Sequence, residues 1–459
     1  MSRPLYQRRF AELQAKRTSL RHELDDWKTQ TVTSPALRRH HSQIRLLDAT
    51  LTGVLDAIAA DMDVVAKTLA TPAAAQTILE QAIRWENHIL AAHSIWEFFR
   101  SKYVLRQNEL FRDYLAACDD LAWACYEPAL RAFTPGTPKE PPLVFLSATW
   151  SPFAQARDSN FQNEVRVSGG SREALADEPF QQILRQLPVP LLSLPWYETF
   201  HLPAAVLLAH EVGHLVELEF NLSDDLANTL QRANLQAPEV WRGWRAEVFA
   251  DVYGCLAMGP AFVGALMDLL TIAPATLAKE HRRAGTHPTR AVRVQLLLTV
   301  LSRMGYAEDS QRLQATWKST YPTSECPADL APDIEPVVHA LLTGPFRGIP
   351  LTQVITLPPT DSVRKIARFA GQGARKSLEV YTDPRYLLAA AQSLHEEPVP
   401  NQSKDAFKLL VDQALRRGHN QFRNAGVPVL ELAELDTALR PREKQARQDG
   451  ARLCDHLFR

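Results

Sequence analysis

The sequence predicts a mainly α-helical (α+β) fold, in which a helical core with a small sheet is flanked by two helical regions. Apolar residues recur with the helical period along most of the 459 residues, which favours helices over strands. A short apolar run at 143–146 follows the Pro-rich segment 134–142 and predicts a strand. Because a chain of this length forms two or three packed units, we expect an N-terminal region at 1–133, a core at 142–305 and a C-terminal region at 306–459.

The N-terminal region carries a four-three repeat of apolar residues, which predicts a helical hairpin or a short coiled coil. A break at 31–37 divides the repeat into two stretches, whose members are Tyr6, Phe10, Leu13, Leu20, Leu24 and Trp27, then Ile44, Leu47, Leu51, Val54 and Ile58. Such a stripe can pack within its own chain, mediate homo-oligomerisation or hold a protein partner, and the sequence leaves all three open. Helical patterns continue from Gln76 to Ala132.

The core contains the apolar run PAAVLLAHEVGHLVEL, which predicts a helix with Pro203 in its first turn. His210 and His214 are four residues apart, so both imidazoles lie on one face and can bind one metal ion. Glu211 follows the first histidine and could serve as a general base. The alternative is a pair of ordinary core histidines beside a solvated carboxylate. Burying three polar groups in so apolar a helix is costly without a partner, which favours the metal.

A second helix, from Pro238 to the break at Gly259-Pro260, supplies a third candidate ligand. Catalytic zinc usually takes three protein ligands and keeps a fourth position for water, and Glu247 is the best candidate for the third. Asp251 lies one turn further on the same face, where it could accept a ring N–H from a ligating histidine. The alternative is that Glu247 and Asp251 form a solvated acidic edge.

The motif HEVGH at 210–214, followed by E-x-x-A-D at 247–251, resembles the gluzincin zinc metallopeptidases. The A-D ending is closer to the CAAX-prenyl-protease-like and HtpX-like family than to thermolysin. The resemblance implies a zincin-like core and a Zn²⁺ ion held by His210, His214 and Glu247. That family is largely membrane-embedded and commonly has Arg directly before the ligand Glu, where this chain has Ala246. We therefore do not transfer the substrate class of the family.

A third element, Thr286-His287-Pro288 with Arg293 downstream, is similar to the segment that follows the zinc helices in that family. The resemblance implies that His287 lies near the active site and stabilises an oxyanion. The alternative is structural, because Pro288 favours the first position of a helix and His287 would then simply precede that helix. Arg293 is equally open to interpretation as a surface cation or an internal salt-bridge partner.

The segment from Val189 to Phe200, just before the zinc helix, predicts an extended stretch. In gluzincins an edge strand in that place pairs with the substrate backbone, so this segment could bind a peptide by β-augmentation. The alternative is an apolar strand or Pro-rich connection packed on the core. The sequence leaves both interpretations open.

Composition limits the partners and the location of the chain. The formal net charge of -1 provides no field that would attract nucleic acid. Breaks at Gly259-Pro260 and Pro274 divide the apolar stretch 255–278, so no membrane span is expected. Five scattered cysteines and an N-terminus without a signal-peptide pattern predict a cytoplasmic protein without a disulfide framework.

The predicted function is that of a zinc metalloendopeptidase, a selective intracellular or regulatory protease acting on proteins or peptides. Zinc would activate a water molecule, and Glu211 would carry its proton to the leaving amine. Two alternatives remain: a helical interaction or regulatory protein with a structural or degenerate zinc site, and a peptidase resembling the ImmA-like proteins, which cut a repressor. Glu211 favours an enzyme, since a structural zinc site needs no base and is usually closed by a fourth ligand. The C-terminal region carries no motif.

Overall fold

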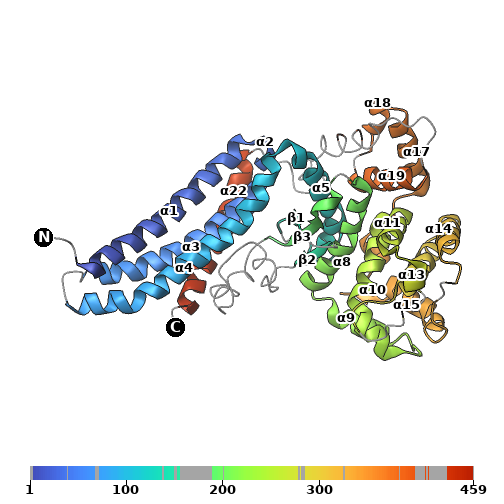
Figure 1. Cartoon of the computed structure of the whole chain (residues 1–459), viewed down its shortest axis with the longest axis horizontal. Helices are drawn as coiled ribbons and strands as arrows, with labels where there is room; N and C mark the ends of the chain where they lie inside the picture. Colours follow the sequence, from blue (N-terminus) through green and yellow to red (C-terminus); the bar gives the residue numbers. More distant parts are fainter. Residues whose placement is uncertain are drawn as a thin grey trace. The chain divides into compact units, whose positions relative to one another are not determined.

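The mainly α-helical fold with a small sheet is confirmed by the computed structural model (Figure 1). The structure describes residues 4–38, 40–67, 72–136, 139–148, 152–155, 189–199, 201–277, 280, 285–323, 326–381, 383–397, 409, 412 and 432–457. These residues form two compact units. The N-terminal bundle contains the described residues of Met1–Arg112, Arg157–Val189 and Gly426–Arg459, and the core unit contains those of Asp113–Ala156 and Pro190–Ala425.

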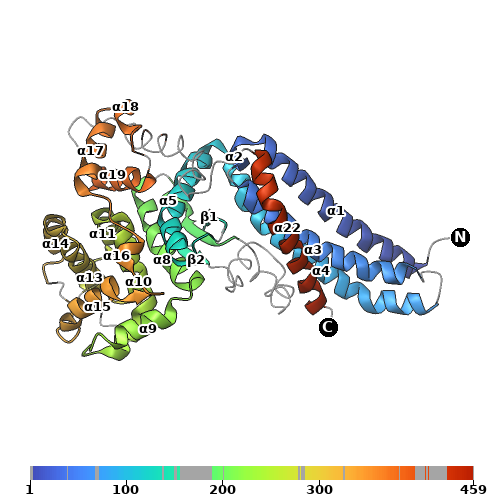
Figure 2. The ribbon, with the colours of Figure 1, turned by 180° about the vertical axis from the view of Figure 1, so that it is seen from behind.

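The N-terminal bundle consists mainly of long helices, which lie side by side in both views (Figures 1 and 2). They are α1 (Leu5–Thr33), α3 (His41–Ala66), α4 (Pro72–Val104) and α22 (Leu432–Leu457), with the short α2 (Pro35–Arg38) between α1 and α3 and the 3₁₀ turn η1 (Leu105–Gln107) after α4. The predicted helical hairpin is therefore confirmed as α1 and α3. Ten of the apolar stripe residues are buried, namely Phe10, Leu13, Leu20, Leu24, Trp27, Ile44, Leu47, Leu51, Val54 and Ile58. This stripe packs within its own chain.

Helix α22 packs closely against α3, a contact between segments that are far apart in the sequence. A Cβ atom on Gly53 would lie 2.1 Å from the carbonyl oxygen of Arg447, and one on Gly450 would lie 2.1 Å from that of Thr50. Only glycine therefore allows the two backbones to approach this closely. Arg45 of α3 also donates two hydrogen bonds of 2.6 and 2.7 Å to Glu443 of α22.

The core unit contains a small mixed sheet beside the helix α5 (Glu109–Phe133). Its strands are β1 (Leu143–Ser147), β2 (Phe153–Gln155) and β3 (Leu191–Pro195), and their order is β1-β3-β2. Strand β1 confirms the strand that the sequence predicts at 143–146. β3 is buried along its whole length and pairs with β1 in parallel and with β2 in antiparallel. Asp119 of α5 accepts a 3.0 Å hydrogen bond from the backbone N–H of Val144, which joins this helix to the sheet.

The central position of β3 decides between the two interpretations of the segment before the zinc helix. Over Leu191–Ser193 the prediction that this segment pairs with a substrate backbone is wrong, because β1 and β2 take both edges of β3 there. The alternative, an apolar strand packed on the core, is confirmed for Leu191–Pro195. Phe200, at the end of the predicted segment, lies outside the described residues.

The two predicted zinc-site helices follow the sheet. The chain passes through the 3₁₀ turns η2 (Trp196–Glu198) and η3 (Leu202–Leu207) into α8 (Leu208–Glu219), α9 (Ser223–Gln231), α10 (Pro238–Met258), α11 (Pro260–Leu270), α12 (Pro274–Leu277) and α13 (Arg290–Arg303). The first turns of the expected zinc helix are thus 3₁₀, a common start for an α-helix. α10 ends at Met258 and is followed by Gly259, whose φ of +63° favours glycine. Within the described part of the chain, no helix has the length and apolar character needed to cross a membrane.

The elements between residues 307 and 396 belong to the core unit, where α15 and α19 pack on α10. They are α14 (Ala307–Thr320), α15 (Ala331–Thr343), β4 (Pro345–Phe346), β5 (Ile349–Pro350), α16 (Leu351–Val354), α17 (Thr360–Gly371), α18 (Arg375–Leu378) and α19 (Pro384–Glu396). The buried carboxylate of Asp333 accepts hydrogen bonds from the backbone N–H groups of Gln236 and Ala237 at 2.7 and 2.9 Å. It also accepts one from the indole of Trp241, at 2.9 Å. Asp333 thereby caps α10 from α15.

These contacts explain why the two units differ from the three regions expected from the sequence. The C-terminal region does not form one body, because α14 to α19 belong to the core unit and α22 belongs to the N-terminal bundle. Residues 113–133 of α5 belong to the core unit as well. Both differences arise from contacts between residues far apart in the sequence, which a division by composition and linkers does not detect.

Candidate metal centre

Helices α8 and α10 touch at two small residues, Gly213 and Ala250. A Cβ atom on Gly213 would lie 2.8 Å from the Cα atom of Ala250, closer than real side chains allow. The glycine of HEVGH and the alanine of E-x-x-A-D therefore form the contact point of the two helices. This close approach brings the polar side chains on either side of it together across the interface.

Three of the predicted site residues converge at this interface. His210, His214 and Glu247 each offer one ligand atom, and these atoms lie within 4.8 Å of one another. The two Nε2 atoms are 3.2 Å apart, and they lie 3.4 and 3.5 Å from the carboxylate oxygens of Glu247. In the described part of the chain, this is the only group of His, Cys, Asp and Glu residues with such spacing.

The donor set fits the chemistry of Zn²⁺. Two imidazoles and one carboxylate are a ligand set of catalytic zinc, which leaves one coordination position for water or substrate. The two imidazole rings are perpendicular, with centroids 4.7 Å apart, so each can direct its Nε2 lone pair towards one point. The His210 and Glu247 side chains are nearly buried, and His214 is only slightly more exposed. A cation between them would satisfy three polar groups that have little access to solvent.

Asp251 lies where the sequence predicted it, beside the first histidine. Its Oδ1 atom is 2.9 Å from Nδ1 of His210, which favours the tautomer with the proton on Nδ1 and a free lone pair on Nε2. Arg293 of α13 donates two hydrogen bonds to Asp251, of 2.7 and 2.6 Å. Asp251 is 1% exposed and Arg293 is 9% exposed, so Arg293 is an internal salt-bridge partner and not a surface cation.

The electrostatics of the metal-free site divide its carboxyl groups into two kinds. Burial disfavours the charged form of Glu247, but hydrogen bonds from His210 and His214 outweigh it and hold the pKa of Glu247 well below its usual range. Burial also tends to raise the pKa of Asp251, but the charge and hydrogen bonds of Arg293 outweigh burial and lower this pKa. At Glu211 burial outweighs the charges of His210 and His214, so the pKa of Glu211 is raised. Burial tends to lower the pKa of His210, but Asp251 and Glu247 raise it to about 9.

Glu211 is part of the same site although it is not a ligand candidate. It follows His210 on α8 and is 7% exposed. The charges of His210, His214 and Glu247 all act on its carboxyl group. A carboxyl group in this place is available for proton transfer, because it stays outside the three-residue ligand set.

His287 also reaches the site. Its Nε2 atom lies 3.2 Å from Oε1 of Glu247, and its side chain is 63% exposed. The residue precedes α13, which begins at Arg290 rather than at Pro288. The structure therefore brings His287 to the metal centre, as the resemblance implied, but against a ligand oxygen of Glu247.

One residue at the site was not anticipated from the sequence. The ring of Phe262, on α11, lies parallel to the ring of His210 within 10°, with centroids 6.5 Å apart. A Cβ atom on Gly254 would lie 2.7 Å from this phenyl ring, so the glycine leaves the space that the ring occupies. No local pattern indicates this role, because the sequence around Phe262 predicts only a buried helix.

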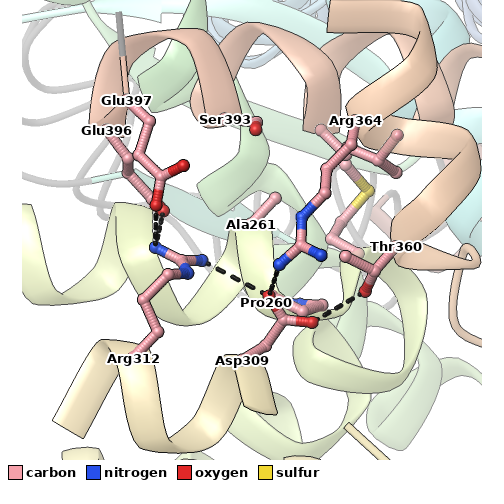
Figure 3. Close-up of a pocket in the computed structure, with 12 residues that line it drawn as sticks. Pro260, Ala261, Asp309, Arg312, Thr360, Arg364, Ser393, Glu396 and Glu397 are labelled. Atoms are coloured by element: carbon pink, nitrogen blue, oxygen red, sulfur yellow. Dashed lines mark hydrogen bonds and ion pairs between the residues drawn. The ribbon is translucent and has the colours of Figure 1, made fainter. Parts of the chain in front are cut away.

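A second cluster of charges lies in a pocket between α11, α14, α17 and α19 (Figure 3). Asp309 accepts hydrogen bonds from Thr360 and Arg364, at 2.9 and 3.1 Å. Arg312 pairs with Glu396 at 2.8 Å and with Asp309 at 3.6 Å. Because arginine has no lone pair for a metal, this cluster is a set of ion pairs and not a second metal centre.

Comparison with known proteins identifies no relative of this chain. No protein family, no curated protein and no solved structure matches the chain. The molecule is therefore defined by its own features, a mainly α-helical chain with a His-His-Glu site between α8 and α10. Its function has to be argued from that site.

Proposed function

We propose that this chain is a zinc-dependent metallopeptidase of the gluzincin type. The observation that carries the proposal is the convergence of His210, His214 and Glu247, whose ligand atoms lie within 4.8 Å of one another. Glu211 adds a buried carboxyl group beside the first ligand. A purely structural zinc site is usually closed by four protein ligands, whereas the described residues supply a group of three.

Each residue of the site has a separate task in this mechanism. When bound, Zn²⁺ would polarise the scissile carbonyl and acidify the attacking water. Glu211 accepts a proton from this water and passes it to the leaving amine, first as a base and then as an acid. Asp251 fixes the tautomer and the orientation of His210, and Arg293 keeps Asp251 ionised and in place.

The sheet supplies a candidate surface for an extended substrate. In the described part of the sheet β2 is an edge strand, antiparallel to β3, and it packs against α8. An extended peptide could pair with the outer edge of β2 through its backbone and pass close to the zinc helix. This arrangement supports a protein or peptide substrate and gives to β2 the role that the sequence suggested for β3.

The decisive experiment separates catalysis from metal binding. Glu211→Gln should retain zinc but lose proteolysis, because the amide cannot accept the proton of the water. Glu239→Gln is a matched control, since Glu239 is an exposed carboxylate on α10. The measurement compares newly formed protein N-termini in cells that express the wild type, Glu211→Gln or Glu239→Gln. Identical N-terminal profiles for the wild type and Glu211→Gln would refute the peptidase proposal.

A further inference from the structure

His287 lies against the carboxylate of Glu247 at the candidate metal centre. Its Nε2 atom lies 3.2 Å from Oε1 of Glu247. It does not belong to the group of three whose ligand atoms lie within 4.8 Å of one another. His287 therefore contacts one ligand of the metal centre without joining the ligand set.

The loop around His287 directs the imidazole ring of this residue towards Glu247. Nδ1 of His287 lies 2.8 Å from the hydroxyl oxygen of Thr286. If this hydroxyl donates to Nδ1, the ring proton is on Nε2 and is donated to the carboxylate of Glu247. The loop also passes over α10 one turn before Glu247, where a Cβ atom on Gly243 would lie 3.6 Å from the carbonyl oxygen of Gly285.

Glu247 needs a contact of this kind once a metal is bound. Among the described residues its ion pairs are with His210, His214 and His287. The first two are ligand candidates themselves, so the metal would replace their contacts with Glu247. His287 is then the partner that still holds the carboxylate, as Asp251 holds His210. Such outer contacts orient a ligand and raise its affinity for the metal.

We propose that His287 is a positioning residue, which donates a hydrogen bond to Glu247 and holds this third ligand in the orientation that binds the metal. The inference rests on the metal centre of the proposed function and replaces the oxyanion role implied by the resemblance. It predicts that His287 contributes to metal affinity in the absence of any substrate.

The test is a titration of the metal-free full chain with Co²⁺, followed by visible absorption. His287→Phe should weaken Co²⁺ binding by roughly 10-fold or more, the usual cost of losing such an outer contact. His287→Gln keeps an N–H donor and should bind within about threefold of the wild type. His339→Phe, a change at an exposed histidine on α15, should have no effect. Because His287 is largely exposed, none of these variants should alter the thermal unfolding of the metal-free chain.

Each contrary result has a distinct meaning. Equal Co²⁺ affinity in the wild type and His287→Phe would overturn the positioning role while leaving the metal centre intact. Equal losses in His287→Phe and His287→Gln would overturn the hydrogen-bond donation. A different band shape for Co²⁺ bound to His287→Gln would identify His287 as a direct ligand and also overturn the inference. Failure of the wild type to bind Co²⁺ would overturn the proposed function and this inference together.

Discussion

The core unit contains two clusters of charged residues that differ in what their partners can do. At the candidate metal centre, Glu247 faces three histidines, His210, His214 and His287. In the second cluster, Asp309 faces Arg312 and Arg364 (Figure 3). Both clusters join helices, and each contains a carboxylate that is nearly buried. Burial and charge alone therefore do not distinguish a functional site from a structural one.

The difference lies in the cations. A guanidinium group only donates hydrogen bonds, so the arginines of the second cluster pair with its carboxylates and offer no lone pair to a metal ion. A histidine can lose its proton and then present a lone pair to a metal ion. Convergent histidines, and not buried charge as such, therefore distinguish this site from the second cluster. We expect substitutions at the candidate metal centre to lower metal affinity and substitutions in the second cluster to leave it unchanged.

The largest effect is expected from Glu247→Ala. Removing a direct ligand should weaken Zn²⁺ binding by more than the roughly 10–100-fold typical of an outer contact. Competition with a chromophoric chelator would measure the affinity. Glu396→Ala is the matched change in the second cluster, where the carboxylate pairs with Arg312, and it should leave zinc affinity unchanged. Equal losses in both variants would remove the distinction between the clusters.

Asp251→Asn should have the next largest effect, because the amide contacts His210 less favourably and leaves Arg293 without its counter-ion. Zinc affinity should fall by about 10–100-fold. The free energy of unfolding should fall by about 3 kcal/mol, since the guanidinium is left buried and unpaired. Chelator competition and urea unfolding would measure the two quantities. An unchanged zinc affinity would show that Asp251 serves only the salt bridge.

Much of the candidate metal centre could be predicted from the sequence because its signals are local. The spacing of His210 and His214 along one helix, and of Glu247 and Asp251 along another, places each pair on one face. Helix period and breakers also predicted α10 with its observed bounds. What brings the two pairs together is the contact of Gly213 with Ala250, which has no signal of its own in a single sequence.

The remaining features depend on contacts between distant residues. Asp333 caps α10 across 96 residues, and Arg45 pairs with Glu443 across 398 residues. The central place of β3 depends in the same way on its two neighbours, because an apolar run at an edge and one in the middle of a sheet share one pattern. These contacts explain why the predicted regions and the predicted substrate strand differ from the structure.

Gly213→Ala tests whether the close helix contact holds the ligands at their spacing. The added methyl group would meet the Cα atom of Ala250 at 2.8 Å, so α8 and α10 must move apart. Overpacking of this kind should lower the free energy of unfolding by about 1–3 kcal/mol. We expect a weaker but measurable loss of zinc affinity than in Asp251→Asn, because all ligands remain. A loss of stability with full zinc affinity would show that the ligands adapt to the wider spacing.

Asp309→Asn should have the smallest effect on metal affinity, because it should leave this affinity unchanged. The same substitution should nevertheless destabilise the fold. Asp309 is buried and accepts hydrogen bonds from Thr360 and Arg364, so it links α14 to α17. Replacing it should lower the free energy of unfolding by about 1–3 kcal/mol, as for other buried hydrogen-bonded groups. Urea unfolding and chelator competition on the same sample would separate the two quantities. If zinc affinity also fell, the second cluster would be coupled to the candidate metal centre. The contrast between an arginine cluster that serves only the fold and a histidine cluster proposed to bind metal would then be refuted.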